Sequence, residues 1–276
     1  MSAIDPVVIV AATRTPLGRF QGELSSLQAP ELGAHVIRAA LERAGLSAER
    51  VDEVLFGCVL PAGQGQAPAR QAARGAGLPD AVGATTINKV CGSGMKATML
   101  AHDLILAGSA SIAVSGGMES MSNAPYLLAK ARGGYRMGHD RIFDHMMLDG
   151  LEDAYEKGRS MGDFGEMAVE AYQFSRDDQD AYAVETLSRA RRALETGAFE
   201  AEITPVSVAG KGGPVTIAKD EHPQKVSPEK IPASEGLRSS GASKNWEKCM
   251  SWAWVCFMAA TNARPIVIVL NSFFIV

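Results

Sequence analysis

A cysteine stands at the junction between a strand-like and a helix-like stretch of this chain. Cys91 lies in the segment NKVCGSGMKA (residues 88–97), after a β-branched run at 84–88 and before residues 95–106, whose apolar positions have helical spacing. The free N–H groups and the positive dipole end of a helix N-terminus favour a thiolate, the form of cysteine that attacks carbonyl carbons. Gly92 and Gly94 leave room for a large acyl donor and for backbone N–H groups to face a developing oxyanion. Cys91 is therefore the candidate nucleophile.

Two other interpretations of this segment stay open. Cysteine is among the most often buried residue types, so a structural role for Cys91 is the first alternative. The pattern Gly92-x-Gly94-x-x-Ala97 also fits a dinucleotide fingerprint, with Glu119 as its acidic residue. However, Glu119 is farther along the chain than that fingerprint requires, and the first strand is followed by ATRTP (12–16), which has no glycine-rich turn.

Composition narrows the class of protein. The chain has 276 residues, a formal net charge of -4 and a pI near 5.8, so no basic field favours nucleic acid as a partner. The four cysteines, Cys58, Cys91, Cys249 and Cys256, show neither a C-x-x-C pair nor a metal-ligand spacing, which predicts a reduced compartment and no metal. The first residues match neither a secretory signal nor a transit peptide, so we expect a cytoplasmic protein.

The N-terminal part alternates strand and helix patterns. Strands are predicted at 7–12, 51–60, 84–88 and 111–115, and helices at 30–44, 67–75 and 95–106. This alternation predicts an α/β fold with a mainly parallel sheet between helices. The run at 7–12 is apolar throughout, as in a strand buried on both faces, and Cys58 is expected in the core.

The pattern changes after residue 120 and again near residue 233. Strand signals become rare between 123 and 230, where the clearest element is a helix at 176–195, so we expect an inserted, loop-rich subdomain. Beyond 233 the composition shifts, because Trp246, Trp252 and Trp254 are the only tryptophans of the chain. The apolar C-terminal region is split by TNARP (261–265) into two pieces, each too short to span a membrane, and 266–270 is a candidate strand at the sheet edge.

These segments together resemble the thiolase family, the acetyl-CoA acetyltransferases and 3-ketoacyl-CoA thiolases. The matching motifs, in order, are VAATRTP (10–16), NKVCGSGMKA (88–97), GGMESMS (116–122), DGL (149–151), SMG (160–162) and SRDDQD (175–180). The resemblance covers roughly residues 5–233. A ketosynthase-like relative would share the fold and the nucleophile, but GGMESMS favours a thiolase.

The resemblance implies a domain plan and an activity. Residues 1–120 would form an N-terminal α/β half-domain with a five-stranded, mixed but mainly parallel sheet, and 121–233 a loop subdomain that covers coenzyme A. Cys91 would be acylated by an acyl-CoA and would pass the acyl group on in a Claisen condensation, or run the reverse thiolysis. Coenzyme A would be substrate and product rather than a permanently bound cofactor, and Leu151, Ser160 and Met161 would line its channel. Family members are homodimers or tetramers, with no membrane partner.

The chain also departs from the family pattern. The residue at Ser160 is often His in the family, and Gln224 stands where an Arg is usual. The C-terminal half-domain, with its Gly-His-Pro histidine and Cys-x-Gly-Gly-Gly cysteine, is expected to be absent, and 234–276 is interpreted as a foreign or frameshifted tail. Two hypotheses follow: an acyltransferase impaired by truncation, or a non-catalytic fragment that at most binds coenzyme A or a partner subunit.

Overall fold

The computed structural model describes residues 7–231 and 266–270, which fall into two compact units. The first unit contains residues 7–125, 200–219 and 266–270, and the second contains 126–199 and 220–231. Residues 200–219, which the sequence assigned to the loop subdomain, thus group with the first unit. The remainder of the predicted tail lies outside the described residues.

The first unit follows the predicted alternation of strands and helices. Its main elements are β1 (Val8–Ala11), α1 (Ala29–Ala44), β2 (Glu53–Gly57), α2 (Pro68–Gly75), β3 (Gly83–Ile87), α3 (Ser93–Leu106), β4 (Ala113–Gly117), β7 (Val206–Gly210), β8 (Gly213–Ile217) and β9 (Ile266–Leu270). Gly45 ends α1 in the left-handed conformation, at a φ of 62°, as its position after the last apolar residue predicts.

Five strands of this unit form one sheet in the order β1-β9-β4-β2-β3. Every pairing is parallel, so the α/β fold is confirmed and the sheet is wholly parallel rather than mixed. β9 lies between β1 and β4 and pairs with both, so the prediction of an edge strand there was wrong. An uncharged run of β-branched residues suits such an interior parallel strand.

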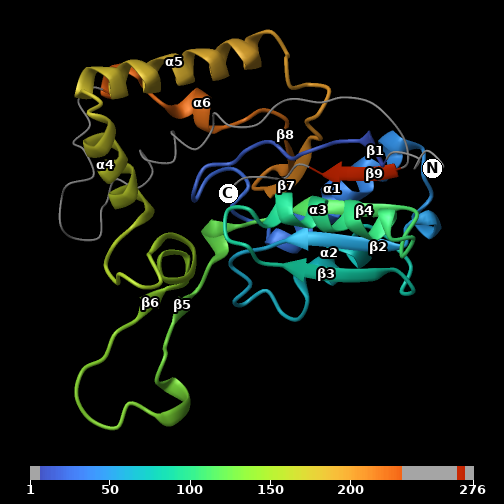
Figure 1. Ribbon diagram of the computed structural model, residues 1–276, viewed down its shortest axis with the longest axis horizontal. Coiled ribbons are helices and arrows are strands. Elements are labelled where there is room, and N and C mark those ends of the chain that lie inside the picture. The colour runs from blue at the N-terminus through green and yellow to red at the C-terminus, as the bar shows by residue number, and fades with distance from the viewer. Residues whose placement is uncertain (1–6, 232–265, 271–276) are drawn as a thin grey trace. The chain divides into compact units, whose positions relative to one another are not determined.

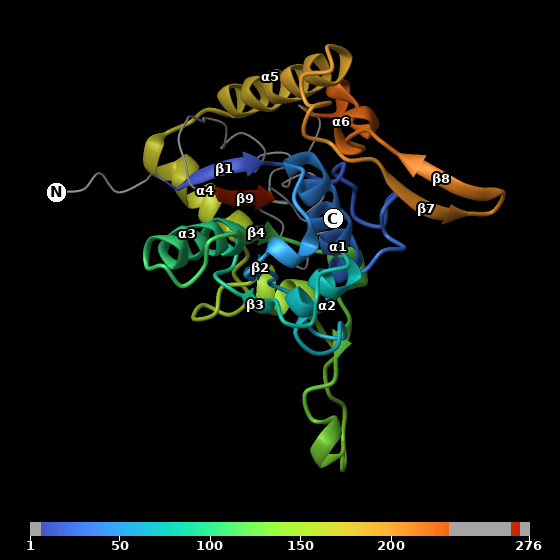
Figure 2. The same cartoon turned by 90° about the vertical axis from the view of Figure 1, so that its right-hand side faces the viewer.

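Helices cover both faces of the sheet (Figures 1 and 2), with α1 and α2 together on one face and α3 on the other. Alternate residues of β2 point to opposite faces: Val54 and Phe56 pack with α1 and α2, whereas Leu55 packs with Ala97 and Ala101 of α3. The core of this unit therefore has two layers, one on each side of β2 and β4.

The first strand differs from its prediction. β1 is at the edge of the sheet, and Ile9 and Val10 are 62% and 40% exposed, so it is not buried on both faces. The apolar run at 7–12 predicted the strand correctly. The burial of a strand, however, depends on which elements pack beside it in the sheet, and the run itself does not determine these.

The β7–β8 hairpin was not predicted from the sequence. Val206, Val208 and Ile217 of this hairpin pack against Leu24 and Leu32, and this contact groups it with the first unit. The other residues of its strands are mostly exposed, so the apolar signal in the sequence is weak.

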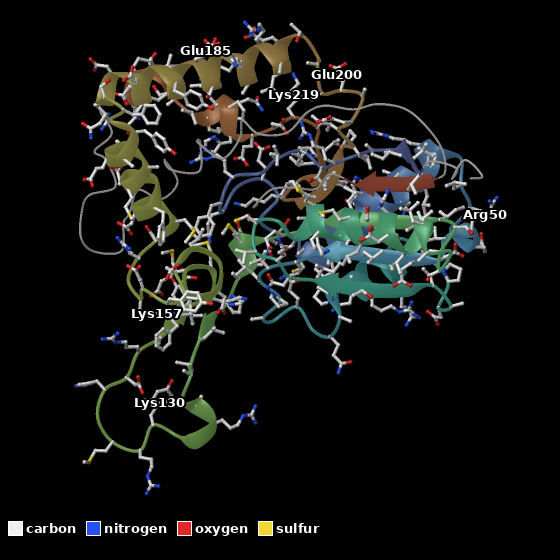
Figure 3. All side chains as sticks on the ribbon, in the orientation of Figure 1. Arg50, Lys130, Lys157, Glu185, Glu200 and Lys219 are labelled. Carbon is white, nitrogen blue, oxygen red and sulfur yellow. The ribbon has the colours of Figure 1, made fainter. Side chains whose placement is uncertain are left out.

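The second unit is built from short strands and helices. Its main elements are β5 (Tyr126–Leu127), β6 (Phe143–Asp144), a π-helical turn (Met147–Leu151), α4 (Met161–Tyr172), α5 (Arg176–Glu195) and α6 (His222–Lys225). Arg191 of α5 donates hydrogen bonds to the carbonyl oxygens of Pro223 and Val226, which fastens α6 to α5. Figure 3 shows Glu185 on α5, where it pairs with Arg189, and Lys130 on the β5–β6 loop, where it pairs with Asp140 at 2.7 Å. Among the described helices, none has the length and apolar composition needed to cross a bilayer.

The last residue of β2 allows α3 to approach the sheet closely. A Cβ placed on Gly57 would lie 2.7 Å from the backbone nitrogen of Gly94 and from the carbonyl carbon and Cβ of Ser93. Real Cβ contacts do not occur at that distance, and backbone atoms cannot swing aside as a flexible side chain can. The first turn of α3 therefore requires glycine at position 57.

We predict that Gly57→Ala lowers the free energy of unfolding by about 1–3 kcal/mol, because the added methyl group forces α3 away from β2. Gly212→Ala is the matched control, since a Cβ at Gly212 meets nothing within 4 Å. Denaturant unfolding of both variants measures the difference. Equal free energies of unfolding for the two variants would contradict the close approach at Gly57.

Candidate active site

Cys91 occupies the predicted position at the N-terminus of α3. Gly92 is the N-cap residue, α3 begins at Ser93, and Cys91 is exposed. The residues that precede Cys91 leave the carboxyl end of β3, the side of a parallel α/β sheet on which ligands usually bind. The alternative of a buried structural cysteine therefore does not fit Cys91.

Hydrogen bonds within the turn use two of the backbone N–H groups beside Cys91. The N–H of Gly92 donates to the carbonyl of Lys89 at 3.1 Å, and the N–H of Ser93 donates to the carbonyl of Val90 at 3.0 Å. These two groups hold the turn, so they can face an oxyanion only if the turn opens. These hydrogen bonds leave fewer backbone N–H groups at this helix end for a ligand to engage.

Glu119 has a structural role that the sequence did not indicate. Its carboxylate accepts hydrogen bonds from the N–H groups of Val59 at 2.8 Å and Leu60 at 3.1 Å, where the chain leaves β2. These two hydrogen bonds exclude the dinucleotide interpretation, which required Glu119 as the ribose-binding acid.

Asn88 and Ser93 contact the turn before α3 through their side chains. The sequence did not predict them as site residues.

Cys58 contrasts with Cys91. It is 2% exposed and belongs to the core cluster on the α1 and α2 face, as the sequence predicts. Burial, reinforced by the negative charge of Glu119, raises the pKa of the Cys58 thiol to about 12. Cys58 is therefore protonated and unreactive at neutral pH.

The three residues expected to line the coenzyme A channel lie in the second unit. Leu151 ends the π-helical turn, Ser160 is the N-cap residue of α4, and Met161 is its first residue. An antiparallel bridge between Glu152 and Ser160 brings the two segments together. Single π-helical turns occur often at functional sites.

Ser160 is engaged in capping α4. Its backbone N–H and its hydroxyl both donate to the Asp163 carboxylate, at 2.7 and 2.9 Å. These hydrogen bonds hold the pKa of Asp163 below its ordinary value. Met161 beside it is 45% exposed and offers an apolar surface.

A histidine–aspartate pair lies in the same unit. His145 is 4% exposed, and its Nδ1 lies 2.6 Å from an Asp149 carboxylate oxygen, with Asp149 inside the π-helical turn. The pair ties His145, which precedes the N-cap residue of the π-helical turn, to the middle of that turn and so supports the segment that ends at Leu151. No sequence spacing singled out His145, because an i, i+4 pair is informative only once the segment is known to be helical.

Comparisons with known proteins agree with this arrangement. The family described as "Thiolase, N-terminal domain" matches residues 7–235. An acetyl-CoA acetyltransferase of Cupriavidus necator is 52% identical over 216 residues, which are 78% of this chain and 55% of that protein. Acetyl-CoA acetyltransferase 2 of Arabidopsis thaliana is 53% identical over 217 residues, covering 78% and 54% of the two chains. The solved structure of an acetyl-CoA acetyltransferase from Syntrophomonas wolfei matches with a TM-score of 0.76 and 39% identity, over 83% of this chain and 57% of that one.

An α/β unit with a cysteine at a helix N-terminus is what the resemblance to thiolases implies. The family match favours a thiolase over a ketosynthase-like relative. The chain belongs to the thiolase family, in which it corresponds to the N-terminal domain. It spans about half the length of the curated relatives that it matches.

The two described cysteines should differ sharply in reactivity. We predict that iodoacetamide at pH 8 modifies Cys91 in the folded chain and leaves Cys58 unmodified, because a thiol whose pKa is raised to about 12 is almost wholly protonated there. Peptide mapping by mass spectrometry measures both sites, and the same reaction in urea should modify both. Native-state modification of Cys58 as fast as that of Cys91 would contradict the environment assigned to Cys58.

Proposed function

We propose that this chain carries out acyl transfer to and from coenzyme A thioesters through an acyl-cysteine at Cys91. The observation that carries the proposal is the exposed Cys91 at the N-terminus of α3, within a domain of the thiolase family. The relatives quoted above are named acetyl-CoA acetyltransferases, which supports acetyl-CoA or a 3-ketoacyl-CoA as the substrate class.

The first half-reaction needs one nucleophile. The Cys91 sulfur attacks the thioester carbonyl, the bond between that carbon and the coenzyme A sulfur breaks, and coenzyme A leaves with the proton that Cys91 lost. With a 3-ketoacyl-CoA the sulfur attacks the 3-keto carbon instead, the bond between that carbon and the α-carbon breaks, and the departing acyl-CoA takes up the proton at its α-carbon. The positive end of the α3 dipole favours both the attacking thiolate and the developing oxyanion.

The second half-reaction returns the acyl group. In thiolysis the coenzyme A sulfur attacks the acyl-cysteine, and in condensation the deprotonated α-carbon of a second acyl-CoA does so. Either route regenerates Cys91 and conserves the acyl group. Condensation also requires a base for the α-carbon, and we assign that role to none of the described residues.

Leu151, Ser160 and Met161 are proposed to contact coenzyme A. The bridge that joins their segments and the exposure of Met161 support a shared surface. Because the Ser160 hydroxyl already donates to Asp163, the contribution of Ser160 would come from its position at the start of α4.

We also propose that the protein assembles as a homodimer or tetramer.

A second candidate is a non-catalytic subunit or fragment that at most binds coenzyme A or a partner. The observation in its favour is that the chain spans about half the length of its relatives. It predicts binding of coenzyme A without acylation of Cys91.

The two candidates differ in a single-turnover experiment. We predict that the purified chain, incubated with acetoacetyl-CoA, gains an acetyl group on the Cys91 peptide and releases acetyl-CoA. Cys91→Ser should abolish the modification, because no other described thiol is exposed. Mass spectrometry of the digested protein locates the group, and the Cys58 peptide of the same sample is the internal control.

Acetylation confined to Cys91 supports the enzyme. An unmodified Cys91 in a folded chain that still binds coenzyme A would favour the non-catalytic candidate, and acetylation of the Cys58 peptide would overturn the assignment of the nucleophile.

A further inference from the structure

We infer that Ser93 and Asn88 are positioning residues that hold Val90 in a left-handed conformation and thereby fix Cys91 at the N-terminus of α3. The inference rests on the proposed function, since it concerns the placement of the nucleophile. It adds two residues that do not themselves react.

Val90 has an unusual backbone for its side chain. Its φ is 47°, in the left-handed region that glycine adopts freely and that a β-branched residue adopts rarely. The side chain of Val90 is 50% exposed, so burial does little to offset this conformation. Contacts of the backbone must therefore hold Val90 in place.

Ser93 supplies the first of these contacts. Its hydroxyl accepts a hydrogen bond from the N–H of Lys89 at 2.8 Å and donates one to the carbonyl of Val90 at 2.6 Å. The backbone N–H of Ser93 donates to the same carbonyl at 3.0 Å. Ser93 is 4% exposed and its Cβ faces Gly57, so the hydroxyl is held by the close approach of α3 to β2.

Asn88 supplies the second contact and connects the turn to the sheet. Its Oδ1 accepts from the N–H of Val90 at 2.9 Å, and its Nδ2 donates to the carbonyl of Val59 at 3.3 Å. The N–H of Val59 in turn donates to Glu119, which follows β4. The turn is thus fastened to the chain that leaves β2, β3 and β4.

The two side chains hold the two peptide units that flank the Cα of Val90. Asn88 binds the N–H of Val90 and Ser93 binds its carbonyl, so both ends of Val90 are fixed. If either contact is lost, Val90 can relax to the extended region, and that rotation moves Cys91 away from the helix N-terminus. Away from it, the Cys91 sulfur no longer lies at the positive end of the helix dipole, which favours negative charge.

The test uses the reactivity of Cys91 in the whole chain. We expect Ser93→Ala and Asn88→Ala each to slow alkylation of Cys91 by iodoacetamide at pH 7 about two- to fivefold, the factor that loss of a helix-terminus charge interaction gives. Thr98→Val is the control, because it removes another hydroxyl from α3. That hydroxyl donates to the carbonyl of Gly94 at 3.2 Å and accepts from the Ser115 hydroxyl at 3.2 Å, and neither contact touches the turn. The alkylation rate of Thr98→Val should equal that of the unmodified chain.

A second substitution that restores the alkylation rate of Cys91 distinguishes a positioning role of Ser93 from a role in stability alone. Glycine adopts positive φ without steric cost, so in a Val90→Gly background Ser93→Ala should slow alkylation much less than it does alone. The midpoint of thermal unfolding of each variant is measured together with its alkylation rate. If the role of Ser93 is purely structural, Ser93→Ala lowers the midpoint but does not slow alkylation of the folded chain, and Val90→Gly rescues nothing.

Acetylation by acetoacetyl-CoA is followed in the same variants. An alkylation rate of Ser93→Ala equal to that of the Thr98→Val control overturns the positioning role, whether or not Cys91 accepts an acetyl group. A slowed and rescued alkylation in a chain that is never acetylated upholds the positioning role and overturns the proposed function instead.

Discussion

The close approach of α3 to the end of β2 is the constraint on which the rest of the candidate site depends. It exists because Gly57 has no Cβ, so the backbone at Ser93 and Gly94 can lie directly against the strand. The helix N-terminus is thereby fixed at the carboxyl end of the sheet, and the residue two positions before Ser93 is Cys91. A larger residue at position 57 would displace the helix and the proposed nucleophile, Cys91, together.

Hydrogen bonds between side chains and the main chain connect the sheet to the turn that holds Cys91. Three consecutive strand ends take part, through Glu119 after β4, Val59 after β2 and Asn88 after β3. Each contact is ordinary in strength, but together they leave the turn few alternative conformations. Cys91 is thus exposed at a turn held by these contacts, whereas Cys58, the residue directly after β2, is buried.

The sequence predicted those features that arise from local physics. Apolar runs and helical spacing located β1 to β4 and α1 to α3, and Gly45 marked the end of α1 because its left-handed φ of 62° suits glycine. It also placed Cys91 correctly at the start of α3. The sequence could not predict that β9 lies inside the sheet or that β1 lies at its edge. Strand order is decided by packing between distant segments.

Much of the site was likewise beyond local patterns. The contacts of Glu119 link residues about 60 positions apart, and the role of Ser93 depends on the backbone of Val90, whose β-branched side chain argues against a left-handed conformation. Asn88, two residues before Val90, fits the pattern of an asparagine that binds a backbone N–H two positions on, and this signal could have been read from the sequence. Leu151 and Ser160 came only from family resemblance, because their proximity depends on the bridge at Glu152.

Contacts within the chain form the turn at Cys91 before any substrate binds. Amide hydrogen exchange at Lys89, Val90 and Ser93 in the ligand-free protein tests this, since each of these N–H groups donates to an acceptor within the turn. We expect exchange at least about tenfold slower than in an unfolded chain at all three sites. Exchange of these amides at unfolded-chain rates, while the amides of β2 stay protected, would contradict it.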